Sequence, residues 1–318
     1  MTKILRAGLP IVFASLLTTG PALATEVHTW VSSTGSGAAC TRALPCATLQ
    51  AAHDNTTRGG IISILDPNEF EPNGLTITKA ITVRAEGVDG GAAEAVVFGG
   101  GSWVTVQAFY LDDVVTLEGL HFSGGGAVEF LSGAQLHIVR CVFTNGAGAG
   151  DAGIKFRPNG TSKLNVTDTV ISNMGAGTGG GIVVNPQAGG TAQVALERVS
   201  VNGGAFGIAV DGSSSTGGIN MTVADSMVAN NSKDGIVATT SSGHAPIGVM
   251  VINTKSVNND FGVRSIGPNV TVRVQNSQLT GNDNGLSFSG GAALLSAGNN
   301  VVEANTNNGA FSGQVTLK

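Results

Sequence analysis

Apolar and polar residues alternate in short runs along most of this chain, and one block of that pattern recurs. The block has an alternating apolar run, a polar bend, a shorter apolar run, one or two Asn residues, and a Gly followed by Ile or Leu. Three clear copies span residues 163–182, 220–236 and 271–286. Period-two alternation between turn residues predicts β-strands with one buried face.

Two columns of the repeat keep a common spacing. The Gly that opens the second strand recurs every 23 to 28 residues, at Gly153, Gly181, Gly207, Gly235, Gly262 and Gly285. The bend recurs every 23 to 30 residues, at Arg140, Asp168, Arg198, Asp225, Asn253, Asn276 and Asn299. Tight bends need left-handed backbone angles, which Gly, Asn and Asp tolerate best. We therefore expect the bends at Arg140 and Arg198 to differ locally, and the alternating charges predict a weak salt-bridge ladder.

A repeat of this length, with no helical segment between its strands, predicts a right-handed parallel β-helix. Each strand would pair with its counterpart one coil away, and inward Val, Ile, Leu and Phe would stack on their equivalents. We expect an all-β, single-domain solenoid of about ten coils, spaced about 4.8 Å apart. The competing repeat fold, the β-propeller, has blades of about 40 to 50 residues and does not fit this period.

The N-terminal part departs from the repeat. The sequence predicts a signal peptide over residues 1–24, a cap region over 25–60 and β-helix coils over 61–318. Within the cap, residues 45–54 predict a short helix with Leu49, Ala52 and His53 on its apolar side. Such a helix would cover the open end of the solenoid, whose unpaired backbone is otherwise an edge prone to aggregation.

The first 24 residues have the pattern of a secretory signal. Lys3 and Arg6 precede a short apolar run over 9–17, and residues 22–24 read Ala-Leu-Ala, a small-residue cleavage site. The apolar run is shorter than the roughly 18 residues that span a bilayer. We therefore expect a secreted or periplasmic protein without a membrane span, with an uncleaved anchor as the alternative.

Composition and charge narrow the range of partners. The chain has 48 Gly, 12% charged and 42% hydrophobic residues, which is too little charge and too much apolar side chain for a disordered polymer. Its 16 basic residues face 21 acidic ones, and cleavage of the signal would remove two basic groups. Because phosphate binding needs a cationic surface, we expect no nucleic-acid partner.

The three cysteines indicate one disulfide and no metal centre. Cys40 and Cys46 lie close together in the exported part, and an oxidising compartment favours a structural disulfide between them, with two unpaired thiols as the alternative. Cys141 lies in an apolar strand pattern, where a buried free thiol is common. The five His residues are scattered without ligand spacing, so we expect no metal and no cofactor.

The N-terminal motif and the repeat resemble those of a known superfamily. The run Trp30-Val-Ser-Ser-Thr-Gly-Ser-Gly37, then Cys40, then Pro45-Cys-Ala-Thr-Leu-Gln-Ala-Ala52 resembles the start of pectate lyase-like β-helix proteins, and the Asn-Ser and Gly-Ile coils match their repeat. More narrowly, the chain is similar to an uncharacterised secreted bacterial branch of that superfamily. The resemblance implies the fold over residues 27–318, but it does not imply one activity, because the superfamily includes lyases, hydrolases, esterases and adhesins.

Motifs of the superfamily's enzymes are largely missing from this chain. Polygalacturonase-like hydrolases carry acidic pairs with Gly-His-Gly and Arg-Ile-Lys elements, whereas this chain has only Asp112-Asp113, in a turn that we expect to be solvated. Carboxylates in the coils are few and do not form one column, as a Ca²⁺-dependent lyase would need. Asp151, Lys155 and Arg157 predict at most a small cationic patch. The sequence assigns no catalytic residue, and we expect no cleavage of pectic substrates.

Two functional classes therefore stay open. The first is a non-catalytic surface or scaffold protein that contacts a polysaccharide or a cell-envelope component. The second is a carbohydrate-active enzyme, pectate lyase-like or polygalacturonase-like, with a divergent site. The missing motifs favour the first class, although aromatic residues that could stack on sugars make up only 5% of the chain. A groove with convergent carboxylates on one coil face would favour the second class.

Overall fold

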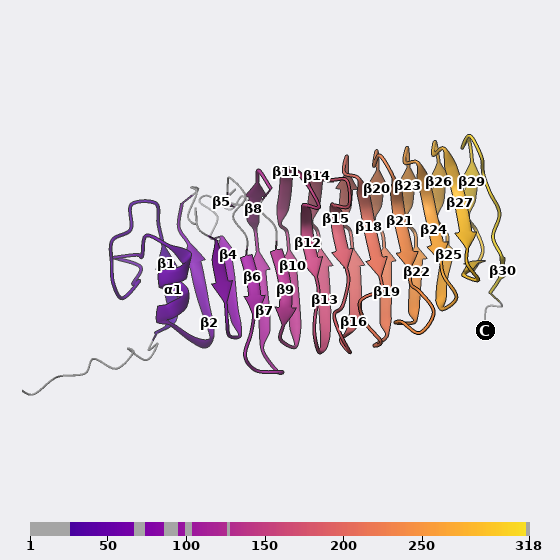
Figure 1. Cartoon of the computed structure of the whole chain (residues 1–318). Coiled ribbons are helices and arrows are strands. Elements are labelled where there is room, and N and C mark those ends of the chain that lie inside the picture. Colours follow the sequence, from indigo (N-terminus) through magenta and orange to yellow (C-terminus); the bar gives the residue numbers. More distant parts are fainter. Residues whose placement is uncertain (1–25, 67–73, 86–94, 99–103, 126–127, 316–318) are drawn as a thin grey trace, which may run out of the picture.

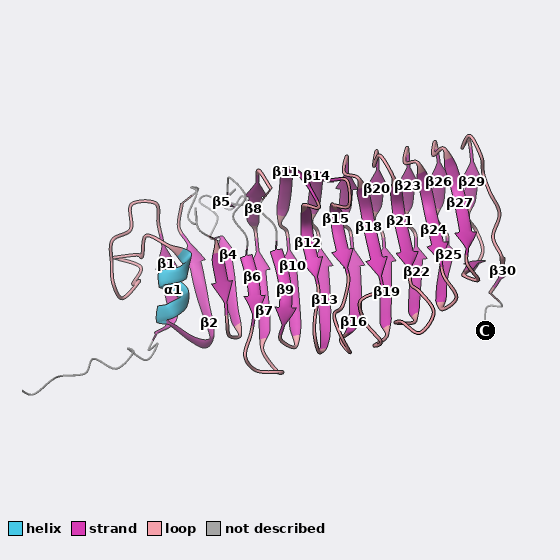
Figure 2. Cartoon of the chain, in the orientation of Figure 1, coloured by secondary structure: helices cyan, strands magenta, loops and turns pink. Residues whose placement is uncertain are grey.

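The computed structural model describes residues 26–66, 74–85, 95–98, 104–125 and 128–315, so the predicted signal peptide lies outside it. These residues form a parallel β-solenoid of about 9 turns with a single helix (Figure 1), which confirms the predicted all-β fold class. The strands run across the long axis of the molecule, and the helix lies at its N-terminal end (Figure 2). None of the described helical segments is long and apolar enough to cross a membrane.

Three parallel sheets, which we call A, B and C, form the faces of the solenoid. Sheet A contains twelve strands: β1 (Glu26–Val31), β2 (Thr56–Ile64), β4 (Ile81–Ala85), β7 (Val114–Glu118), β10 (Gln135–Val139), β13 (Thr161–Thr167), β16 (Thr191–Glu197), β19 (Ile219–Ala224), β22 (Ile247–Ile252), β25 (Val270–Gln275), β28 (Ala293–Ser296) and β30 (Gly313–Gln314). A typical coil passes from sheet A to sheet C and then to sheet B before it returns to A.

Sheets B and C contain nine strands each. Sheet B consists of β3 (Leu75–Ile77), β6 (Val104–Gln107), β9 (Val128–Ser132), β12 (Ala152–Phe156), β15 (Gly180–Val184), β18 (Phe206–Asp211), β21 (Asp234–Thr239), β24 (Phe261–Ile266) and β27 (Asn284–Ser289). Sheet C consists of β5 (Ala95–Phe98), β8 (Leu120–Ser123), β11 (Val142–Ala149), β14 (Val170–Ala176), β17 (Ser200–Asn202), β20 (Met227–Ala229), β23 (Lys255–Val257), β26 (Gln278–Thr280) and β29 (Val301–Glu303).

The core follows from the alternation along each strand. Inward side chains form one continuous apolar cluster along the axis, while their strand neighbours face solvent. Equivalent residues stack from coil to coil: the Phe122 and Phe143 rings lie 4.5 Å apart, and the Phe130 and Phe156 rings lie 4.8 Å apart. The Gly column begins the strands of sheet B, and a Cβ on Gly181 would collide with Val201, so these positions need Gly for close packing.

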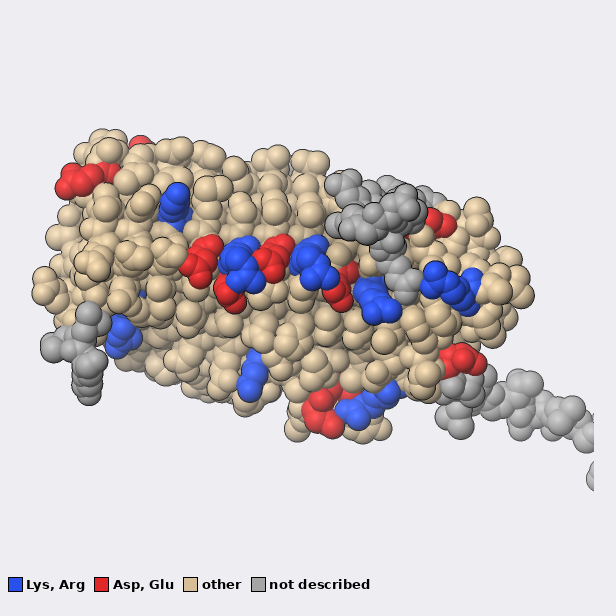
Figure 3. Space-filling view, turned by 180° about the vertical axis from the view of Figure 1, so that it is seen from behind, with Lys and Arg blue, Asp and Glu red and all other residues tan. Residues whose placement is uncertain are grey.

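All seven residues of the predicted bend column adopt a left-handed backbone. Arg140 and Arg198 have φ values of 51° and 52°, the same as Asp168 at 52°, so the expectation that the Arg bends differ was wrong. The side chains alternate in charge along the solenoid (Figure 3), but the pairing is only partly a ladder. Arg198 bridges one coil to Asp168 at 2.7 Å, whereas Arg140 pairs with Glu118.

Buried asparagines replace apolar side chains in the C-terminal coils. The amide of Asn259 accepts a hydrogen bond from Asn231 at 2.8 Å and donates one to Asn282 at 3.1 Å, and Asn282 donates to Asn305 at 2.9 Å. Because each amide has a partner one coil away, these polar groups are buried without loss of hydrogen bonds. The turns between sheets C and B are fixed by this amide ladder.

The N-terminal end is closed by helix α1 (Leu49–Asn55), which confirms the predicted short helix. Thr48 caps it by accepting a hydrogen bond from the Ala51 amide at 3.1 Å, and Leu49, Ala52 and His53 are its buried residues. Strand β1 and the start of β2 lie within residues 25–60, so the cap region also contributes strands to sheet A.

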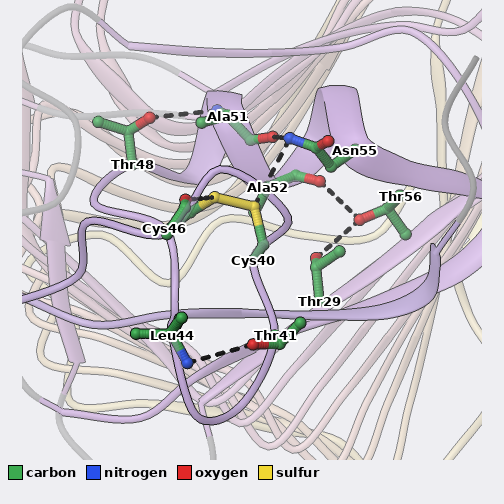
Figure 4. Close-up of a disulfide and its surroundings, with 11 residues drawn as sticks. Thr29, Cys40, Thr41, Leu44, Cys46, Thr48, Ala51, Ala52, Asn55 and Thr56 are labelled. Atoms are coloured by element: carbon green, nitrogen blue, oxygen red, sulfur yellow. Dashed lines mark hydrogen bonds between the residues drawn. A yellow bond between two sulfur atoms is a disulfide. The ribbon is translucent and has the colours of Figure 1, made fainter. Parts of the chain in front are cut away.

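A disulfide between Cys40 and Cys46 holds the loop that precedes the helix (Figure 4). The Cα atoms of the two cysteines are 4.5 Å apart, and the Asn55 side chain reaches back from the helix to the Cys40 sulfur. The disulfide closes the loop of residues 40–46, and the Asn55 contact connects that loop to helix α1. Cys141 is the free thiol, and its complete burial raises its pKa to about 12.

Candidate functional site

A pocket of about 520 Å³ opens on the outer face of sheet B. Its floor is apolar: Val183, Ala209 and Val237 occupy one register position on β15, β18 and β21. Charged side chains from three successive coils stand around this floor, namely Asp211, Lys233, Asp234, Asp260 and Arg264. The site is thus an apolar strip with mixed charges at its side.

Asp234 is the central charged residue because of its place in the coil. It is the first residue of β21 and precedes Gly235, where an added Cβ would meet Asn259 and the neighbouring coil. The next coil has Phe261 at the paired position. This tight entry into the strand leaves the Asp234 side chain only 5% exposed.

Two cations line the pocket, and each lies over an aromatic ring. The Arg264 guanidinium is 4.3 Å from the centre of the Phe261 ring, with its Nη1 3.7 Å from Asp234 Oδ1. The Lys233 ammonium lies 4.8 Å from the Phe206 ring and donates to the Gly177 carbonyl at 2.5 Å. Cation–π contacts of this kind hold the two charged groups in fixed positions.

Two buried polar atoms of the pocket lack a hydrogen-bond partner. Among the described residues only five buried side-chain atoms are in this state, and Asp234 Oδ1 and Arg264 Nε are two of them. A buried polar atom without a partner costs free energy, and native proteins retain few of them. The surrounding coils therefore leave one acceptor and one donor unsatisfied beneath the charged side of this pocket.

The pKa of Asp234 is raised to about 6, first by burial and also by the negative charge of Asp260, while Arg264 opposes the shift. Asp260 lies one coil above, where its backbone amide donates to the Lys233 carbonyl at 2.9 Å. A carboxyl group with such a pKa exchanges its proton near neutral pH. The arrangement can accept or donate hydrogen bonds, and it can supply a proton to a ligand.

The structure places the predicted cationic residues at the edge of this pocket or away from it. Lys155 on β12 pairs in register with Val183, one strand beyond the apolar floor, and burial lowers its pKa. Arg157 forms an ion pair with Glu129 at 3.1 Å, and the Asp151 carboxylate accepts from the Gly148 amide at 2.7 Å. Glu129 and Asp151 lie near Lys155 and Arg157, so acidic neighbours offset these cations.

The Asp112-Asp113 turn differs from the solvated turn that the sequence predicts. Asp113 is fully buried, and both carboxylates pair with Arg58 at 2.5 to 2.6 Å. The Arg58 hydrogen bond lowers the pKa of the Asp112 carboxyl. This pair is therefore a structural brace and not a candidate catalytic pair.

A second depression, of about 500 Å³, crosses the outer face of sheet A. Its lining mixes apolar residues such as Met221 and Met250 with polar ones, and Lys163 and Arg273 lie four strands apart within it. No carboxylate lines this depression. Over the described part of the chain, no group of three or more His, Cys, Asp or Glu side chains could hold a metal ion.

Sequence reasoning missed the sheet B pocket because it compared carboxylates within single columns. Asp234 and Asp260 occupy neighbouring columns, one directly before the repeated Gly and one two residues before it. The usable signal was local: Lys233-Asp234-Gly235 and Asp260-Phe261-Gly262 concentrate charge at one strand entrance in two successive coils, followed by Arg264.

Comparison with protein-family models, with curated proteins and with solved structures finds no match to this chain.

Proposed function

We propose that this chain is an exported parallel β-helix protein, akin to the pectate lyase-like group, that binds a saccharide in the sheet B pocket. The observation that carries the proposal is a pocket in which the charged Asp234 and Arg264 side chains stand beside the apolar strip Val183, Ala209 and Val237. Sugar hydroxyls both donate and accept hydrogen bonds, and sugar rings have an apolar C–H face. The pocket offers a complement to both.

Export rests on the basic, apolar and Ala-Leu-Ala elements of residues 1–24 together with the Cys40–Cys46 disulfide. An exported protein meets the polysaccharides of the cell envelope and its surroundings, whereas the acidic net charge disfavours nucleic acid. The saccharide is therefore the ligand class that agrees with both the pocket and the expected compartment.

The test is a glycan array probed with the full chain, followed by calorimetry on the best oligosaccharide. Asp234→Asn and Arg264→Gln should each weaken binding by about tenfold or more, since hydrogen bonds to charged groups contribute roughly 1.5 to 3 kcal/mol. Arg273→Gln, on sheet A, is the matched control and should bind like the wild type. Failure to bind any saccharide, or equal binding by all the variants, would refute the proposal.

A second candidate function, a carbohydrate-active enzyme, is favoured by one specific observation. Asp234 has a pKa raised to about 6 and a second carboxylate, Asp260, nearby on the next coil. One protonated and one ionised carboxyl group are what glycoside hydrolysis uses.

Turnover should be sought by reducing-end and ultraviolet assays on the oligosaccharides that bind. If the enzyme hypothesis holds, Asp234→Asn should lower kcat by about 10²- to 10⁴-fold, the range expected for loss of a general acid. Binding without any turnover would leave the saccharide-binding function alone.

A further inference from the structure

Three consecutive large apolar residues project into solvent from the loop between β6 and β7. Phe109, Tyr110 and Leu111 are 76%, 60% and 85% exposed, respectively. We call these three residues the apolar loop. In Figure 1 the connection that enters β7 reaches further out than the neighbouring loops. Each of the three side chains stays more than half exposed, so most of their apolar surface faces solvent.

The apolar loop is held away from the body by a built support. Asp113 is fully buried, accepts from the Tyr110 amide at 3.0 Å through its carboxylate, and donates from its own amide to the Tyr110 carbonyl at 3.1 Å. Arg58 pairs with this carboxylate at 2.5 Å and lies 4.9 Å from the Tyr110 ring. The Phe109 amide donates to the Thr78 carbonyl at 3.1 Å. A collapse that would cover the apolar side chains would have to break these bonds.

We infer that the apolar loop inserts into the interfacial region of a lipid bilayer. Exposed apolar groups that cannot fold back mark an interaction surface. The loop is convex and its side chains are separately exposed, so a fluid medium can bury all three, whereas one sugar face cannot. Tyr and Arg, with an apolar body and a polar end, suit the depth of the lipid head groups. Here Tyr110 and Arg58 supply those groups.

The position of the loop in the fold agrees with this partner. It precedes β7 at the edge of sheet A where the strands begin, and β1 begins at the same edge with Val27, 72% exposed. Val27 and the apolar loop therefore lie along the same margin of sheet A, three strands apart.

Charge predicts which bilayers the loop should bind. Arg58 pairs with both Asp112 and Asp113, so these three residues carry one net negative charge and supply no attraction to anionic lipid. Attraction to anionic lipid is therefore not required, and binding should rest on apolar burial. Zwitterionic and anionic vesicles should bind the protein about equally at moderate salt.

The test is flotation of the full chain with vesicles of phosphatidylcholine, and of phosphatidylcholine mixed with phosphatidylglycerol. The double variant Phe109→Asn/Leu111→Asn should lower the vesicle partition coefficient by about tenfold or more, since burial of even one large apolar side chain accounts for that factor. Phe288→Asn, which changes a 44% exposed Phe on sheet B, should bind like the wild type.

The inference is overturned if the wild type does not float with either vesicle, or if the double variant floats as well as the wild type. Binding only to the anionic vesicles, unchanged in the double variant, would assign the contact to basic residues elsewhere and would also overturn it. Circular dichroism and thermal unfolding of the variants should match the wild type, because both substituted side chains are exposed. The saccharide proposal concerns another face, so its outcome is independent.

Discussion

Replacing Asp234 by Asn should stabilise the protein at neutral pH. Asp234 is nearly buried, and its pKa is raised from the ordinary value of 3.8 to about 6 because burial disfavours the charged form. The Asn side chain has the shape of the protonated acid and carries no charge. The substitution therefore keeps the packing at the entrance of β21 and removes a charge that the folded state disfavours.

The size of the effect follows from the pKa shift. The difference between the ordinary Asp pKa of 3.8 and the folded value of about 6 corresponds to about 3 kcal/mol between the charged and neutral forms, at 1.36 kcal/mol per pH unit. Because the folded pKa lies above the unfolded one, the native state binds the proton more tightly, and the stability from this group falls as the pH rises from about 4 to about 6. The Asn variant should gain about 2 to 3 kcal/mol over the wild type at pH 7 and less than about 1 kcal/mol at pH 4.

Equilibrium denaturation of both proteins in urea, at pH 4 and pH 7, measures this difference directly. Asp225→Asn is the matched control: Asp225 is an exposed bend residue, Asn occupies the same bend at Asn253, and the change should shift neither midpoint by more than about 0.5 kcal/mol. An Asp234→Asn variant that is less stable than the wild type at pH 7 would show that attraction to Arg264 outweighs burial. A difference independent of pH would show that Asp234 does not titrate in this range.

Three further predictions test the framework of the solenoid. Gly181→Ala should cost about 1 to 3 kcal/mol by thermal unfolding because its Cβ meets Val201, whereas Gly189→Ala, where nothing lies within 4 Å, should be close to neutral. Asn259→Ala should lower the free energy of unfolding by at least about 2 kcal/mol, since it removes several buried amide bonds at once; a smaller loss would mean that water replaces the amide. Thiol titration of the denatured, unreduced protein should count one free thiol, Cys141, and a count of three would contradict the disulfide.

The fold could be predicted from the sequence because the solenoid repeats its constraints. Each coil needs a Gly where the strand of sheet B packs on the core and a left-handed residue at the bend, so both columns appear at regular spacing. The left-handed bends at Arg140 and Arg198 were not predicted, because Arg has a low intrinsic preference for left-handed backbone angles. The neighbouring coils fix the bend at those positions, and pairing with Glu118 and Asp168 holds the side chains outward.

The two surface features were not predictable in the same way because they depend on contacts between different columns. Asp113 becomes buried only because Arg58, 55 residues earlier, lies beside it in the folded solenoid. Asp234 is shifted by burial and by Asp260 and Arg264 on the next coil, and none of these is visible from a periodic pattern. Period and spacing predict what repeats, whereas a functional site is built from residues that interrupt the repeat.

The position of Asp234 illustrates why such an interruption is informative. The coil below has Phe206 and the coil above has Phe261 next to the column Gly, so an apolar residue at 234 would continue an aromatic stack and add stability. The chain instead places there a carboxyl group whose charged form is disfavoured and whose Oδ1 faces Arg264 at 3.7 Å without a hydrogen bond. A solenoid can carry this local cost because its stability is spread over many stacked coils. A residue that breaks the local rule is expected at functional sites, and for this reason the proposed saccharide site centres on Asp234 in the sheet B pocket.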